Sequence, residues 1–178
     1  MNICKSICAA FLLSVVSVGQ VFAQGYPRIS TNGNEHWYYV KYLRSNNVLE
    51  EKGNNVNCRT AVPQVMSSDK QLWKVVADEG FATNKKYKLI SKSGRTLYIN
   101  GTNPYSSRFM AATSPTDITS FHIFQSTNNS FGMGSLELAP DSTNSHAMNQ
   151  VGEIKAGQEI GLWDKGDINN VLTFVSKD

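Results

Sequence analysis

The chain has 178 residues with 17 basic and 14 acidic side chains, a formal net charge of +3 at neutral pH. This length suits one domain with a hydrophobic core and is too short for two ordinary domains. The small net charge argues against a nucleic-acid partner, because the densest basic cluster, residues 85–88, stands at a predicted strand start where lysines are commonly solvated.

Residues 1–23 have the layout of a secretory signal peptide. Lys5 precedes an apolar run over residues 7–18, and the small-residue end at 21–23 predicts cleavage after Ala23. The run is shorter than the roughly 20 residues of a membrane-spanning helix, and no second run follows it. We therefore expect a soluble mature chain that starts at Gln24, is secreted or periplasmic and has no membrane span. A short uncleaved anchor is the alternative.

Cys58 is the one cysteine beyond this leader. A single thiol cannot form an intramolecular disulfide, so the domain depends on its core for stability. Three interpretations of Cys58 remain open at this point: a small buried apolar residue, a bridge to another chain, or a reactive thiol.

Short runs rich in Tyr, Val, Ile, Phe and Trp recur along the chain, separated by clusters of Gly, Asn and Ser. This pattern is typical of β-strands joined by turns. No 12-residue stretch of the mature chain has a 3.6-residue apolar period, so we predict an all-β chain. The predicted strands are 37–43, 72–76, 87–90, 96–99, a strand near 108–112, 121–124, 136–138, 159–163 and 172–175.

The strands belong to a threefold repeat. The units span about 37–80, 86–128 and 135–178, and each has room for four strands. Twelve strands in so small a domain require closure or layering, and three four-stranded units around a pseudo-threefold axis predict a β-trefoil. A β-sandwich fits the strand content but not the period. The equivalent residues are Tyr39, Tyr87 and Leu136 at the opening strands, Leu49 and Leu97 at a turn, and Trp73, Phe121 and Leu172 at the closing strands.

Two segments resemble the ricin-B-type β-trefoil lectins. Gln71-Leu72-Trp73 resembles their Gln-x-Trp signature at the end of a unit. Residues 157–164, followed by Asn169-Asn170, resemble their Gly-x-x-apolar-x-Leu-Trp segment and closing Asn-Gln pair. The resemblance spans roughly residues 37–175 and implies a carbohydrate-binding protein without catalysis or cofactor. The second unit departs from the family pattern, because it closes on Phe121 without a Gln-x-Trp motif.

In these lectins, a sugar-binding unit also supplies an acidic residue just after its second strand, which accepts hydrogen bonds from sugar hydroxyls. The matching positions here are expected to be Lys52, Asn100 and Gln150, with Asn149 as the alternative in the third unit. The resemblance therefore predicts that this carboxylate is missing from all three units, which argues against galactose-type binding.

The third unit carries the aromatic group and the amides that sugar recognition requires. By resemblance, Trp163 is the platform on which a sugar ring stacks. The competing interpretation is structural, with Trp163 on the barrel wall and the polar residues in turns. The polar residues around the platform are Asn149, Gln150, Asp164, Asn169 and Asn170.

A second candidate site is the polar loop of the second unit. Asn100 and Tyr105 stand there with Asn103 and Arg108, and Tyr105 is a candidate replacement for the missing tryptophan. A solvated turn around Pro104 explains the same residues equally well. The first unit has Gln71 but no aromatic residue where a platform is expected, so Gln71 is expected to brace a loop.

No catalytic or metal-binding pattern is present. The three histidines do not stand at metal-ligand spacing, and neither a Gly-x-Ser-x-Gly nor a His-Glu-x-x-His segment occurs. We expect no catalytic residue, metal or cofactor. The leading hypothesis is a lectin-like protein whose partner is a glycan or glycoconjugate. The alternative is a protein-binding trefoil, either a protease inhibitor or a surface-interaction protein, that uses the loop 103–108.

Overall fold

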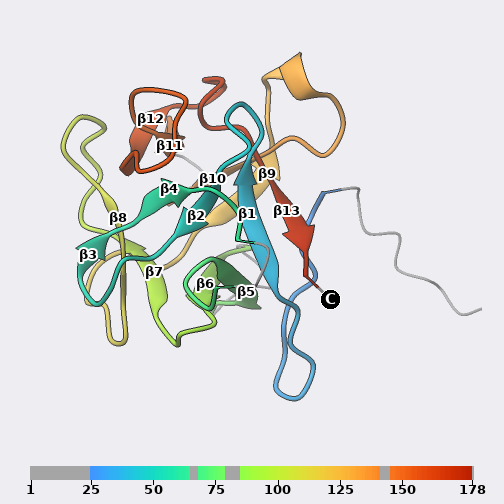
Figure 1. The fold of residues 1–178 in the computed structure, drawn as a ribbon, viewed down its shortest axis with the longest axis vertical. Coiled ribbons are helices and arrows are strands. Elements are labelled where there is room, and N and C mark those ends of the chain that lie inside the picture. The colour runs from blue at the N-terminus through green and yellow to red at the C-terminus, as the bar shows by residue number, and fades with distance from the viewer. Residues whose placement is uncertain (1–24, 65–67, 79–84, 141–144, 178) are drawn as a thin grey trace, which may run out of the picture.

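The computed structural model describes residues 25–64, 68–78, 85–140 and 145–177 (Figure 1). The expected signal peptide and its cleavage point lie outside these ranges. Within them, no helix is long and apolar enough to cross a membrane. The described residues form strands and loops apart from a single 3₁₀ turn, Asn129–Phe131, so the prediction of an all-β chain is confirmed.

The described residues contain thirteen strands, spread over the three repeats. The first repeat has β1 (Tyr38–Tyr42), β2 (Val48–Glu50), β3 (Val56–Asn57), β4 (Arg59–Ala61) and β5 (Leu72–Ala77). The second has β6 (Tyr87–Ser91), β7 (Thr96–Ile99), β8 (Phe109–Ala112) and β9 (His122–Gln125). The third has β10 (Leu136–Ala139), β11 (His146–Gln150), β12 (Ile160–Asp164) and β13 (Leu172–Ser176).

Six of these strands form a closed antiparallel barrel. β1 pairs with β5 and β13, β5 pairs with β6, and β10 pairs with β13 and β9. The barrel closes through Tyr87 and Phe121, whose backbone groups exchange two hydrogen bonds and join β6 to the start of β9. Closure satisfies the backbone groups that an open sheet would leave at its edges.

Three hairpins, one from each repeat, accompany the barrel and gather on the left of Figure 1. They are β2–β4, β7–β8 and β11–β12. The hairpins contact one another through the β3–β8 pairing and through backbone bridges from Arg59 to Glu159 and from Arg108 to Gly161. A six-stranded barrel with three hairpins is a β-trefoil, so the fold predicted from the repeat is confirmed.

The main core is built from equivalent positions of the three repeats. The indole N–H of Trp73 donates a hydrogen bond of 3.1 Å to the carbonyl of Leu49, which ties the closing strand to the hairpin of its own repeat. The equivalent core residues, all fully buried, are Trp73, Phe121 and Leu172, and Leu49, Leu97 and Met148.

The opening strand of the first repeat differs by one residue from the predicted register. Tyr38, not Tyr39, pairs with Trp73 and belongs to the main core. Tyr39 points to the other face of β1 and packs in a smaller cluster with Val48 and Leu72. Adjacent tyrosines of a strand face opposite sides, so the sequence alone does not show which one faces the barrel.

Cys58 is a fully buried member of the main core. Burial raises the pKa of its thiol, and the nearby charge of Glu51 raises it further. The thiol therefore stays protonated at neutral pH and is an inert core side chain.

Candidate functional site

Trp163 is an exposed aromatic side chain at the end of β12. Its neighbour Leu162 is buried in the main core, whereas 43% of Trp163 is exposed. Across the hairpin Trp163 faces Ala147, which is too small to cover the indole ring. Because successive side chains of a strand alternate, Trp163 lies on the outer face and not in the barrel core.

Tyr105 of the second repeat packs against Trp163 of the third. The ring centroids are 5.8 Å apart and the ring planes are at 88°, an edge-to-face contact. Tyr105 is 76% exposed, so the two rings share one solvent-facing surface. We call Tyr105 and Trp163 the aromatic pair. The sequence placed them in separate candidate sites, and the structure brings them together.

The loop that carries Tyr105 is fixed by its own polar side chains. Asn103 Oδ1 accepts a hydrogen bond of 2.9 Å from the backbone N–H of Tyr105. Asn100 Oδ1 accepts one of 2.7 Å from the backbone N–H of Arg108. Asn100 therefore shapes the loop with its carbonyl oxygen, and Tyr105 is presented from a held backbone.

Arg108 and Gly161 hold this loop against β12. Arg108 Nη1 donates 3.0 Å to the carbonyl of Ser107, and the backbones of Arg108 and Gly161 form a bridge. A Cβ at Gly161 would stand 2.9 Å from Val151 Cγ2 and 3.3 Å from the Ser107 oxygen. Only glycine therefore lets the loop approach β12 this closely.

Glu159 joins all three repeats at this point. Its carboxylate accepts hydrogen bonds from Arg108 Nε at 2.8 Å, Asn57 Nδ2 at 3.2 Å and Arg59 Nη2 at 3.4 Å. The bonds from Arg108 and Asn57 lower the pKa of Glu159 below its ordinary value, against a smaller opposing effect of burial. Glu159 is thus ionised at neutral pH and indirectly positions Tyr105 through Arg108.

Three of the predicted site amides are buried and bonded internally, namely Asn149, Gln150 and Asn170. Asn149 Nδ2 donates 2.7 Å to Asn170 Oδ1, and Asn170 Nδ2 donates 2.6 Å to the carbonyl of Asp164. Gln150 accepts from Ser45 Oγ at 2.6 Å. Asn149 and Asn170 hold the 164–170 loop in shape, whereas the side chain of Gln150 bonds Ser45 and the Glu153 carbonyl. None of the three faces solvent.

The other two predicted polar residues of the third repeat remain accessible. The side chain of Asp164 is 78% exposed and its Oδ1 lies 3.3 Å from His146 Nε2. Asn169 is partly exposed, and its Oδ1 accepts a hydrogen bond of 2.8 Å from Arg44 Nη1. Asp164 and Asn169 are therefore the two predicted polar residues of the third repeat that a surface ligand can reach.

A cavity of about 420 Å³ lies at the first repeat, next to Glu50 and Gln71. Gln71 Nε2 donates 2.7 Å to Glu50 Oε2, and Gln71 Oε1 accepts 3.0 Å from the backbone N–H of Gln64. Gln71 braces a loop, as the sequence predicted. Burial alone would raise the pKa of Glu50, but hydrogen bonds from Lys52 and Gln71 outweigh it and lower the pKa.

The Glu50–Gln71 pair corrects the predicted positions of the missing carboxylate. Glu50 bonds the closing amide Gln71 across 21 residues, and Asn149 bonds the closing amide Asn170 across the same 21 residues. Glu50 and Asn149 are thus equivalent, and the alternative Asn149 takes the place of Gln150 in the third unit. Each follows an equivalent core residue, Leu49 or Met148, so the matching residue after Leu97 in the second unit is Tyr98. The predicted positions Lys52 and Asn100 were wrong. The first repeat does carry a carboxylate at this place.

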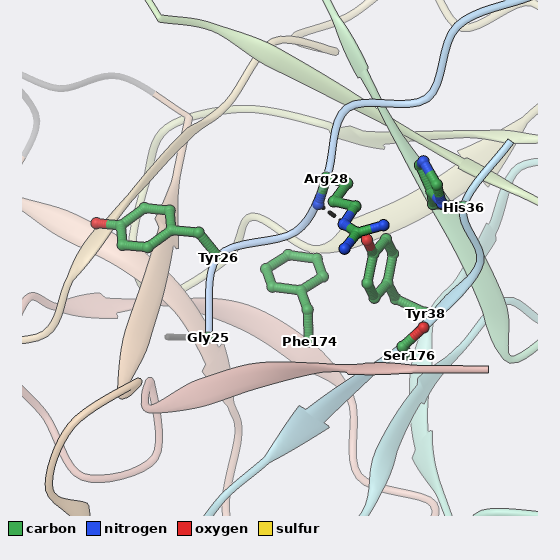
Figure 2. Close-up of a pocket in the computed structure, with 7 residues that line it drawn as sticks. All are labelled: Gly25, Tyr26, Arg28, His36, Tyr38, Phe174 and Ser176. Atoms are coloured by element: carbon green, nitrogen blue, oxygen red, sulfur yellow. Dashed lines mark hydrogen bonds between the residues drawn. The ribbon is translucent and has the colours of Figure 1, made fainter. Parts of the chain in front are cut away.

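A further cavity, of about 480 Å³, lies between the N-terminal segment and the β1–β13 pair (Figure 2). Tyr38 and Phe174 meet there edge to face at 5.9 Å, and the Tyr38 hydroxyl accepts 2.9 Å from the backbone N–H of Arg28. His36 is also among its lining residues. None of the predicted site residues lines this cavity, and the sequence pattern predicts no element over residues 25–36.

Comparison with known proteins addresses the fold. No protein-family model and no curated protein sequence matches the chain. A ricin B-like lectin of Macrolepiota procera, solved in complex with lactose, superposes with a TM-score of 0.64 at 18% identity, covering 83% of this chain and 97% of that one. This chain has the ricin-B-type β-trefoil fold.

Two other solved structures also superpose on this chain over most of their length. The Rhizoctonia solani agglutinin has a TM-score of 0.65 at 12% identity, covering 84% of this chain and 99% of that chain. The designed threefold-symmetric protein ThreeFoil has a TM-score of 0.63 at 16% identity, covering 78% of this chain and 97% of that chain.

In the described part of the trefoil, no group of three His, Cys, Asp or Glu residues is arranged to hold a metal ion.

Proposed function

We propose that this protein is an exported, non-catalytic, lectin-like protein, and that the aromatic pair is its glycan-binding surface. The observation that carries the proposal is the solvent exposure of Trp163 and Tyr105 in a fixed edge-to-face contact. One face of a sugar ring consists of C–H groups, which stack favourably on an aromatic ring. Because the loop and strand that hold the pair are already ordered, binding sacrifices little conformational entropy.

Accessible polar groups of the third repeat supply the hydrogen bonds that fix the orientation of a sugar. The carboxylate of Asp164 is next to Trp163 in the chain and faces solvent, so it is available to accept from sugar hydroxyls. Asn169 has an amide nitrogen that can donate while its oxygen is held by Arg44. The lectin-like fold of the structural neighbours supports this non-catalytic role.

The experiment is a glycan array probed with the wild-type chain and the Trp163→Ala variant. The wild-type chain is expected to bind a defined set of glycans, and Trp163→Ala is expected to lose at least about tenfold in affinity, the effect of losing one good stacking contact. Met133→Ala is the matched control, because Met133 is 88% exposed and its neighbour Gly134 contacts Gly25 at the N-terminal cavity. Equal binding by the wild-type and Trp163→Ala chains, with the fold intact, would refute the proposal.

A protein partner at the same surface is the second candidate, because exposed Tyr and Trp residues are typical of interface hot spots. A protease-inhibitor role receives less support from the structure. Arg108, the basic residue of that loop, bonds Glu159 and has a side chain only 22% exposed. A blank glycan array combined with Trp163-dependent capture of a defined purified protein would favour the protein partner.

A further inference from the structure

We propose that the first-repeat cavity binds the negatively charged group of an acidic saccharide through Lys52 and Arg59. The inference rests on the proposed carbohydrate-binding function for its choice of a saccharide. It concerns a different repeat, different residues and a different ligand chemistry from the aromatic pair. The two proposals can therefore fail separately.

The cavity has fixed walls from two repeats. The β2–β4 hairpin places Arg59 directly opposite Glu50, and Lys52 follows two residues later. The opposite wall is the 156–157 segment of the third repeat. The backbone N–H of Gly157 donates 2.6 Å to the carbonyl of Thr60, which holds this wall against β4. The volume of about 420 Å³ lies within the range of about 300–1,000 Å³ that is typical of small-ligand sites.

Lys52 and Arg59 keep donor capacity beyond the bonds they make. Lys52 Nζ donates 2.6 Å to Glu50 Oε1, and an ammonium group has three donors. Arg59 Nη1 donates 2.9 Å to the Gly157 carbonyl and Nη2 reaches Glu159 at a long 3.4 Å, out of five donors on a guanidinium. Their side chains are 44% and 42% exposed, so a ligand can reach both.

The charge of the cavity favours an anion. Of the described residues that line the cavity, Lys52 and Arg59 are basic and Glu50 alone is acidic. Glu50 is already engaged by Lys52 and Gln71, and Glu159, the 3.4 Å partner of Arg59, does not line the cavity. A carboxylate or sulfate group placed between the two cations gains charge-assisted hydrogen bonds, which are roughly twice as strong as neutral ones. Glu50 and Gln71 remain on the floor to bond neutral hydroxyls of the same sugar.

The equivalent place in the third repeat lacks this charge. There the amide pair Asn149 and Asn170 is closed by Asp167, whose Oδ1 accepts 3.2 Å from Asn149 Nδ2. Lys52 stands two residues after Glu50, and Val151 stands two residues after the equivalent Asn149. Arg59 pairs with Glu50 across its hairpin, and Gly161 pairs with Asn149. Neither Val151 nor Gly161 is charged, so the preference for an anion belongs to the first repeat.

The test is a calorimetric titration of the full chain with four probes. These are a hexuronate-containing disaccharide, the same disaccharide with its carboxyl group reduced to hydroxymethyl, a sulfated neutral disaccharide, and sodium sulfate alone. At least one of the two acidic disaccharides is expected to bind at least about tenfold more tightly than the reduced one. Which of the two binds more tightly identifies the anion, and sodium sulfate is expected to compete with it. Raising the salt concentration is expected to weaken the binding of the acidic disaccharides more than that of the reduced one.

Three variants assign the effect to the cavity. Lys52→Met and Arg59→Met are each expected to lose about tenfold or more in affinity for the acidic disaccharide, with little change for the reduced one. Lys92→Met is the matched control, since its side chain is also 42% exposed and it does not line the cavity. If Arg59→Met fails to fold, Arg59→Lys and Lys52→Met decide the outcome.

Several results would overturn the inference. They are equal binding of the acidic and reduced disaccharides, unchanged affinity in Lys52→Met, or an equal loss in Lys92→Met. Absence of binding by any acidic probe would do so as well. The Trp163→Ala variant distinguishes a failure of the cavity proposal from a failure of the aromatic-pair proposal. It is expected to leave the affinity of the cavity for acidic disaccharides unchanged.

Discussion

Substitution of Glu159 tests how the three repeats are held together at the candidate site. Glu159→Gln keeps the size of the side chain and one acceptor oxygen but removes the charge that Arg108, Arg59 and Asn57 share. A hydrogen bond to a charged group contributes about 1.5–3 kcal/mol when buried. The Glu159 side chain is 33% exposed, so solvent screening reduces the expected loss to about 1 kcal/mol.

That loss is measurable by thermal unfolding. For a domain of this size, about 1 kcal/mol corresponds to a decrease of about 2–4 °C in Tm at neutral pH. The pKa of Glu159 is lower in the folded chain than its ordinary value of 4.5. Its contribution to stability is therefore present above that ordinary value and is lost as the pH falls through the folded-state pKa.

The difference in Tm between wild type and Glu159→Gln is thus expected at pH 7 and is expected to vanish in acid, where the wild-type carboxyl is protonated. Glu153→Gln is the matched control, since Glu153 pairs with Lys155 and its side chain is 73% exposed. It is expected to leave Tm unchanged. A Glu159→Gln effect that is absent at neutral pH, or equally large at low pH, would contradict the proposed ionic link.

Three further predictions concern the core and the loop. Trp73→Ala is expected to destabilise by about 3–5 kcal/mol in urea unfolding, because it leaves a cavity and an unpaired Leu49 carbonyl; a change below 1 kcal/mol would contradict the core role. Gly161→Ala is expected to cost about 1–3 kcal/mol by the same assay and to weaken glycan binding, because its Cβ would force Val151 to shift and would crowd the Ser107 carbonyl in the loop that carries Tyr105. Cys58 is expected to react with a thiol reagent only after denaturation, and rapid native labelling would contradict its burial.

The fold was predictable because the threefold repeat has apolar residues at equivalent core positions of each unit. The hairpin strands were harder to predict. β2 is only Val-Leu-Glu, and β11 reads His-Ala-Met-Asn-Gln, with few β-branched or aromatic residues. Their strand conformation depends on pairing with β4 and β12, which a local pattern does not contain.

The position of the carboxylate was mispredicted because it was expected after the end of the second strand. Glu50 is instead the last residue of β2 and directly follows the core residue Leu49, whereas Lys52 lies two residues further along. The signal that identifies Glu50 is the 21-residue spacing to the closing amide, which both Glu50–Gln71 and Asn149–Asn170 keep.

The aromatic pair was beyond sequence analysis for a different reason. Tyr105 and Trp163 stand at unrelated positions of two repeats, so no period connects them. Their contact follows from the backbone bridge between Arg108 and Gly161, which exists only once the hairpins have assembled. Each residue was identified as a candidate, but their joint surface is a property of the folded trefoil.

The most direct test of the glycan-binding surface is an NMR titration of the indole N–H groups of the three tryptophans with a glycan found on the array. The Trp163 signal is expected to shift on binding, whereas the Trp73 signal is expected to stay, because its N–H is buried and bonded to Leu49. Saturable binding that leaves the Trp163 signal in place would contradict the account.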